Sequence, residues 1–144
     1  MHSCMVDVTD KDIFPKEIKK KVKQTEAGDD TLSNTTPKIY KNIGIYEEEE
    51  LVCGAMGYFI YGWYILEYIW VKPDHRHLGY GKWMIAQLEQ MAKQKKVNGI
   101  RLKICDSSFS TYYQKLGYDI LEEKEIPHLI QKTYCLEKRF HLHS

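Results

Sequence analysis

The chain has 144 residues, of which 43% are hydrophobic and 28% charged, and its formal net charge is +1. This length predicts a single domain spanning residues 1–144. The near-neutral charge argues against a protein that holds nucleic acid by bulk charge, and a mean hydropathy of −0.51 argues against a membrane protein.

The beginning of the chain and its cysteines indicate the cellular compartment. The first residues contain no apolar segment of the kind found in a signal peptide. The four cysteines are far apart and none forms a CxxC pair, which argues against both a zinc site and a disulfide framework. We therefore expect a reduced, cytoplasmic protein. The cysteines are Cys4, Cys53, Cys105 and Cys135.

The first 37 residues have weak patterns. Met5 to Val8 is typical of a short edge strand. Apolar residues four apart predict a helix over Ile13 to Thr25, with a lysine-rich face that we expect to be solvated. Gly28 to Pro37 is a polar loop by composition.

The next segment predicts an antiparallel meander. Strands are expected at Ile39 to Tyr46, Leu51 to Tyr61 and Trp63 to Val71, the last being rich in aromatic and β-branched residues. Glu47 to Glu50 is expected to form a charged, hydrated turn, and Tyr61-Gly62 a tight one. Connections this short join antiparallel neighbours.

The pattern then becomes helical. Apolar residues recur with a period near 3.6 over Gly81 to Lys96, which predicts a helix packed on one face. Asn98-Gly99 is expected to end it, and Ile100 to Ile104 alternates like a strand. The apolar positions of the helix are Met84, Ile85, Leu88, Met91 and Ala92.

A short helix and two strands are expected to complete the domain. Phe109, Tyr112, Tyr113 and Leu116 share one helical face, with Gly117 as its C′ residue and Tyr112 interpreted as a core residue. The final strands are expected at Tyr118 to Glu123 and Leu129 to Lys138. The fold class is therefore α/β in the broad sense, or α+β.

The most informative segment is VKPDHRHLGYGK, from Val71 to Lys82. A strong strand ends, a short polar loop follows, and Gly79 and Gly81 open the long helix. A helix start presents unpaired backbone N–H groups, and glycines let a phosphate approach without meeting a Cβ. The segment favours an anion site as much as a helix start that needs glycine for packing. It is neither a nucleotide P-loop nor a Rossmann fingerprint, because GxxxxGK[ST] and the third glycine of GxGxxG are absent.

Arg76-x-x-Gly79-x-Gly81 resembles the R/Q-x-x-G-x-G/A motif of the GNAT (GCN5-related) N-acetyltransferases. The segment TYYQKLGYDI, from Thr111 to Ile120, is similar to that family's later FYxKLGF element. The resemblance covers about Ile39 to Arg139 and is strongest to small bacterial members. It implies a mixed, mostly antiparallel sheet of six to seven strands, splayed at a cofactor slot and flanked by about four helices.

The resemblance also implies a cosubstrate and the residues that bind it. In the family, the loop binds the diphosphate of acetyl-CoA through backbone N–H groups, and the preceding strand pairs with the pantetheine arm. Carried over to this sequence, the strand residues are Ile69, Trp70 and Val71. The loop residues are Arg76, His77, Leu78, Gly79, Tyr80, Gly81 and Lys82.

For catalysis, Tyr113 matches the family's tyrosine near the cofactor sulfur, and a phenol of pKa about 10 suits protonation of a departing thiolate. Glu67, an acidic residue in an otherwise apolar strand, is the candidate base for the incoming amine. Asp106 and Tyr64 are weaker candidates, and water could serve instead. The alternative roles are core packing for Tyr113 and a solvent-facing or loop-tethering position for Glu67.

Some features depart from the family or leave alternatives open. His77 and Leu78 differ from the usual loop residues, and SSFST lacks the Ala-Pro often found before the tyrosine. His75 and His77 lack a third ligand at useful spacing, so no metal is expected.

The expected activity is acetyl transfer to a primary amine of a small molecule or peptide, with no nucleic-acid or membrane partner. The acceptor site is either open or completed by a second subunit in a homodimer. The competing function is a non-catalytic CoA-binding sensor or interaction module on the same scaffold.

Overall fold

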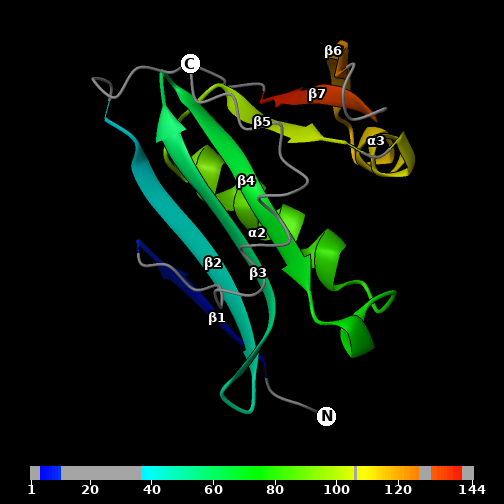
Figure 1. The fold of residues 1–144 in the computed structure, drawn as a ribbon. Coiled ribbons are helices and arrows are strands. Elements are labelled where there is room, and N and C mark those ends of the chain that lie inside the picture. The colour runs from blue at the N-terminus through cyan, green and yellow to red at the C-terminus, as the bar shows by residue number, and fades with distance from the viewer. Residues whose placement is uncertain (1–3, 11–36, 106, 127–130, 141–144) are drawn as a thin grey trace.

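The computed structural model describes residues 4–10, 37–105, 107–126 and 131–140 (Figure 1). The helix expected over Ile13 to Thr25 and the candidate base Asp106 lie outside the described residues. The strands are β1 (Cys4–Thr9), β2 (Ile39–Glu47), β3 (Glu50–Ile60), β4 (Trp63–Val71), β5 (Gly99–Ile104), β6 (Asp119–Ile126) and β7 (Gln131–Arg139). The helices are the 3₁₀ turn η1 (Pro73–His75), α2 (Tyr80–Gln94) and α3 (Ser107–Lys115).

Within the described residues, seven strands form one sheet in the order β1-β2-β3-β4-β5-β7-β6. Every neighbouring pair is antiparallel except β4 and β5, which are parallel. This confirms the mixed, mostly antiparallel sheet of six to seven strands and the β2–β3–β4 meander. Two α-helices are described, where about four were expected; one expected helix falls on residues outside the described ranges.

Helix α2 covers one face of the sheet, packing against β2, β3, β4 and β5 (Figure 1). Four of the five predicted apolar positions are buried there, namely Met84, Ile85, Leu88 and Ala92. The helix ends earlier than Asn98-Gly99, because Lys96 takes a left-handed conformation with φ 56°. Gly99 belongs to β5, where a side chain would collide with the carbonyl of Lys138. No helix in the described ranges is long and apolar enough to cross a membrane.

The buried face of α3 differs from the predicted one. Tyr113 is 4% exposed and Ser110 is buried beside it, whereas Phe109 is 55% and Tyr112 38% exposed. The helix has nine residues, and its contacts with β5, β6 and β7 select which side is covered. The interpretation of Tyr112 as a core residue was therefore wrong. Gly117, with φ 98°, does follow the helix end as predicted.

A glycine in β3 lets one aromatic side chain cross the sheet. The ring of Tyr64 on β4 passes over Gly57, and its hydroxyl donates a hydrogen bond of 2.8 Å to the carbonyl of Lys41 on β2. A Cβ at Gly57 would collide with the ring and with the main chain of Ile65. Because Gly57 has no side chain, Tyr64 of β4 can cross β3 and bond to β2, which links the three strands.

Candidate active site

The sheet opens between β4 and β5. These strands pair only over Tyr64–Leu66 and Ile100–Leu102. Directly afterwards the β3–β4 register slips, so Glu67 lies opposite no residue of β3, as in a β-bulge. Strand β4 continues along β3 to Val71, whereas β5 continues along β7 (Figure 1). The expected splay is therefore present, and it begins at the bulge.

The loop after β4 leads to the start of α2. Gly79 is the N-cap of α2, with φ 91°, and the space where a Cβ would lie is open. His77 is also left-handed, with φ 64°. The Nε of exposed Arg76 donates a hydrogen bond of 2.9 Å to the carbonyl of Val71, which folds the loop back on the strand end.

The first turn of α2 favours an anion. It contains no acidic side chain, so nothing within that turn offsets the positive end of the helix dipole. The first N–H groups of a helix have no partner within the helix. Lys82 is exposed nearby, and Leu78 is 68% exposed at the loop surface. The loop predicted from the two glycines therefore has a suitable shape and charge for a phosphate.

The β2–β3 hairpin contacts this loop through the carboxylate of Glu47. Tyr80 donates a hydrogen bond of 2.9 Å to Glu47, and the His75 Nε2 lies 3.4 Å from the same carboxylate oxygen. The His75 Nδ1 lies 2.7 Å from Asp74, and that hydrogen bond lowers the pKa of Asp74. The predicted charged turn is present at Glu48 and Glu49, which are exposed. Its extension to Glu47 was wrong, because Glu47 ends β2 and its side chain is only 17% exposed. No local signal could reveal a bond that joins residues 33 positions apart.

His75 and His77 are the two histidines of this loop. In the described part of the chain, no group of three or more His, Cys, Asp or Glu side chains is arranged to hold a metal ion.

The two neighbouring tyrosines of α3 face different surroundings. Tyr113 lies in the core, with its ring 5.6 Å from that of Tyr118, and burial raises its pKa. Tyr112 instead reaches toward α2, where its hydroxyl lies 3.4 Å from the position that a Cβ of Gly81 would occupy. The Tyr112 hydroxyl thus lies at the first turn of α2.

The candidate residues of β4 lie along the opening. Ile69 and Val71 pack toward the core, while Trp70 is half-buried. Glu67 lies at the bulge, and its negative charge adds to burial in raising the pKa of Tyr64. Tyr64 is fully buried and bonded to Lys41, which argues against the alternative in which it acts as the base.

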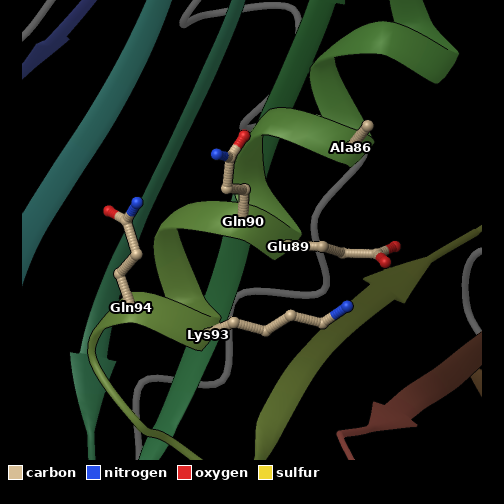
Figure 2. A pocket seen from close by; sticks show the side chains of 5 residues that line it. All are labelled: Ala86, Glu89, Gln90, Lys93 and Gln94. Carbon is tan, nitrogen blue, oxygen red and sulfur yellow. The ribbon is translucent and has the colours of Figure 1, made fainter.

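A separate open hollow lies on the outer face of α2 (Figure 2), lined by Ala86, Glu89, Gln90, Lys93 and Gln94. Glu89 accepts a hydrogen bond of 2.9 Å from Lys138 and one of 3.2 Å from Tyr118. These bonds join α2 to β7 and to Tyr118, the residue directly before β6. The hollow is lined by residues well past the first turn of α2, so it is separate from the glycine-containing loop. The bonds of Glu89 hold neighbouring elements together.

Comparison with known proteins agrees with this geometry. The family profile described as "Acetyltransferase (GNAT) domain" matches residues 38–120, more than half of the chain. No curated protein sequence gives a significant match.

Solved structures resemble most of the chain or nearly all of it. The ribosomal-protein-S18-alanine N-acetyltransferase of Escherichia coli is similar with a TM-score of 0.72 at 13% identity, over 97% of each chain. An acetyltransferase of Bacillus cereus is 26% identical over 87% of this chain and 90% of its own, with a TM-score of 0.66. A candidate streptothricin acetyltransferase of Bacillus anthracis, solved with acetyl coenzyme A, has a TM-score of 0.66 at 20% identity, over 71% of this chain and 64% of its own.

Proposed function

Because the chain belongs to the GNAT acetyltransferase family, we propose that it transfers an acetyl group from acetyl-CoA to a primary amine of a small molecule or peptide. The observation that carries this proposal is the position of the sheet opening. It begins at the β4 bulge and runs beside the strand that leads into the glycine-containing start of α2.

The loop fits a diphosphate on three grounds. A Cβ position at Gly79 faces open space, the first turn of α2 contains no acid, and Arg76 and Lys82 are exposed beside it. Backbone N–H groups from Arg76 to Lys82 would bind the phosphate oxygens. The main chain of Ile69, Trp70 and Val71 has no β5 partner. Apart from the Val71 carbonyl, which accepts from Arg76, the edge of this segment is open to an extended pantetheine arm.

Two side chains supply the proton chemistry in this proposal. Glu67, at the bulge, accepts a proton from the incoming amine, which must be neutral to attack the thioester. Tyr113 donates a proton to the departing thiolate. A phenol is protonated at neutral pH, as a donor requires, and burial raises the pKa of Tyr113 further.

The placement of the loop is tested with two valines on one helix. Gly81→Val puts a side chain at the first turn of α2, whereas Ala86→Val adds bulk on the exposed face of the same helix. We expect Gly81→Val to abolish acetyl-CoA binding in isothermal titration and Ala86→Val to retain it. Retained affinity in Gly81→Val, with an unchanged circular dichroism spectrum, would refute the loop as the diphosphate site.

The competing function is a CoA-binding sensor without turnover. The burial of Tyr113 favours the sensor, because a proton donor needs access to the cosubstrate and Tyr113 is only 4% exposed. Thiol release from acetyl-CoA is measured against a panel of amines. The panel includes a peptide with an alanine amine and streptothricin, because similar solved structures are named for those substrates. Thermal stabilisation by acetyl-CoA without thiol release on any amine would support the sensor.

The homodimer remains a prediction for this protein. Light scattering with and without acetyl-CoA measures the mass of the particle. A monomer that is fully active would exclude an acceptor site completed by a second subunit.

A further inference from the structure

We propose that Tyr112 is a ligand of the cosubstrate diphosphate, donating a hydrogen bond from its phenol hydroxyl to a phosphate oxygen. This inference rests on the proposed function and adds a side chain to a site otherwise built from main-chain groups. Its first support is position. Tyr112 belongs to α3, yet its hydroxyl lies 3.4 Å from the Cβ position of Gly81, the second residue of α2.

The second support is the contrast within α3. Tyr112 and Tyr113 have rings 5.4 Å apart, but they point to different surroundings. Tyr113 is 4% exposed in the core, while Tyr112 is 38% exposed at the helix mouth. In this proposal Tyr113 is the proton donor, and Tyr112 binds the diphosphate at the other end of the slot.

The third support is the chemical state of the hydroxyl. A phenol with the usual pKa near 10 is already protonated at neutral pH, and burial, followed by the nearby Cys53, raises the pKa of Tyr112 further. The Cys53 Sγ itself lies 3.9 Å from the carbonyl of Tyr80, directly under the first turn of α2. A neutral phenol can donate to a phosphate, whereas a phenolate would repel it.

The hydroxyl also has capacity for a ligand. At 38% exposure it is open to solvent, and no hydrogen bond joins it to another of the described residues. A diphosphate at the first turn of α2 would provide the acceptor. Binding would then link α3 to α2 across the opening of the sheet.

The test compares two ligands that differ in the diphosphate. Acetyl-CoA has it, and S-acetyl-pantetheine has the same thioester arm without it. We expect Tyr112→Phe to raise the dissociation constant for acetyl-CoA about tenfold, as loss of a hydrogen bond to a charged group does. Its affinity for S-acetyl-pantetheine should stay within about twofold of the original protein's. Both are measured by thermal-shift titration at millimolar ligand, with Tyr61→Phe, an exposed turn residue, as the control.

The outcomes separate the two proposals. An unchanged acetyl-CoA affinity, or an equal loss for both ligands, would overturn the role of Tyr112 while leaving the proposed function intact. If the unsubstituted protein binds neither ligand, the proposed function fails and the assignment of Tyr112 fails with it. Phenylalanine keeps the ring and its contact with Tyr113, so circular dichroism should show an unchanged fold.

Discussion

Adjacent residues can have opposite roles, as Tyr112 and Tyr113 show. Successive side chains on a helix point about 100° apart, so packing one against the core turns its neighbour outward. Tyr113 is the neighbour that contacts the core and Tyr118. Its proposed role therefore requires that the slot reach the inner side of α3.

The role of Tyr113 predicts a specific kinetic change. Tyr113→Phe should lower kcat about 10²-fold, the low end for general acid catalysis, with KM for acetyl-CoA changed less than about twofold. Tyr118→Phe is the matched control, because Tyr118 is equally buried but bonded to Glu89. Steady-state kinetics on the best amine measures both. An unchanged kcat in Tyr113→Phe would remove the acid role.

Gly57 offers a prediction on stability. Gly57→Ala should lower the free energy of unfolding by about 2–4 kcal/mol, because the new methyl group meets the Tyr64 ring and the main chain of Ile65. Gly81→Ala is the control, since its methyl group would lie in ordinary contact with Tyr112 and alanine favours a helix. Urea denaturation compares the two. Equal stability of both variants would mean that Tyr64 does not cross at Gly57.

At the scale of elements, the β2–β3 hairpin holds the loop through Glu47. Tyr80→Phe removes the 2.9 Å bond to that carboxylate and leaves a half-buried acceptor with one partner fewer. We expect a loss of about 1–2 kcal/mol in unfolding free energy. KM for acetyl-CoA should rise several-fold with little change in kcat, because the loop binds rather than reacts.

Tyr40→Phe is the control for the hairpin experiment. Tyr40 lies in β2, the strand that ends at Glu47, but its ring packs on Tyr58 and the residue is 40% exposed. A rise in KM of the same size in both variants would show that the Glu47 contact does not position the loop.

At the scale of the whole molecule, buried tyrosines should limit stability in alkali. Burial is the largest cause that raises the pKa of Tyr64, Tyr113 and Tyr118 above the usual value near 10. Above that pH, the unfolded chain loses these protons while the folded protein keeps them. Below a pH of about 10, these groups should therefore leave the free energy of unfolding unchanged. Above it, the free energy of unfolding should fall by about 1.4 kcal/mol per pH unit for each tyrosine.

Thermal unfolding between pH 8 and 12 measures this dependence. Tyr118→Phe should show a shallower decline than the original protein, because one titrating group is removed. Tyr61→Phe should decline as steeply as the original, since Tyr61 is 67% exposed. Parallel curves for all three proteins would indicate that other groups control alkaline unfolding.

Local patterns in the sequence were sufficient for several elements and for the family. Strand β4 and the buried face of α2 follow from residues within one segment, because periodicity and propensity act over a few residues. The glycine pair that opens α2 is also a local signal, and the match to residues 38–120 confirms the family that it indicated. The assignment of Tyr113 and Glu67 to catalysis remains a prediction.

Only the tertiary structure decided what depends on distant partners. The insertion of β7 between β5 and β6, and the end of the β4–β5 pairing at Leu66, are set by hydrogen bonds between remote segments. The contact of Glu47 with Tyr80 and the outward position of Tyr112 likewise depend on which surfaces meet. A sequence pattern specifies which side chains share a face, but the packing of whole elements determines which face is buried and which borders the slot.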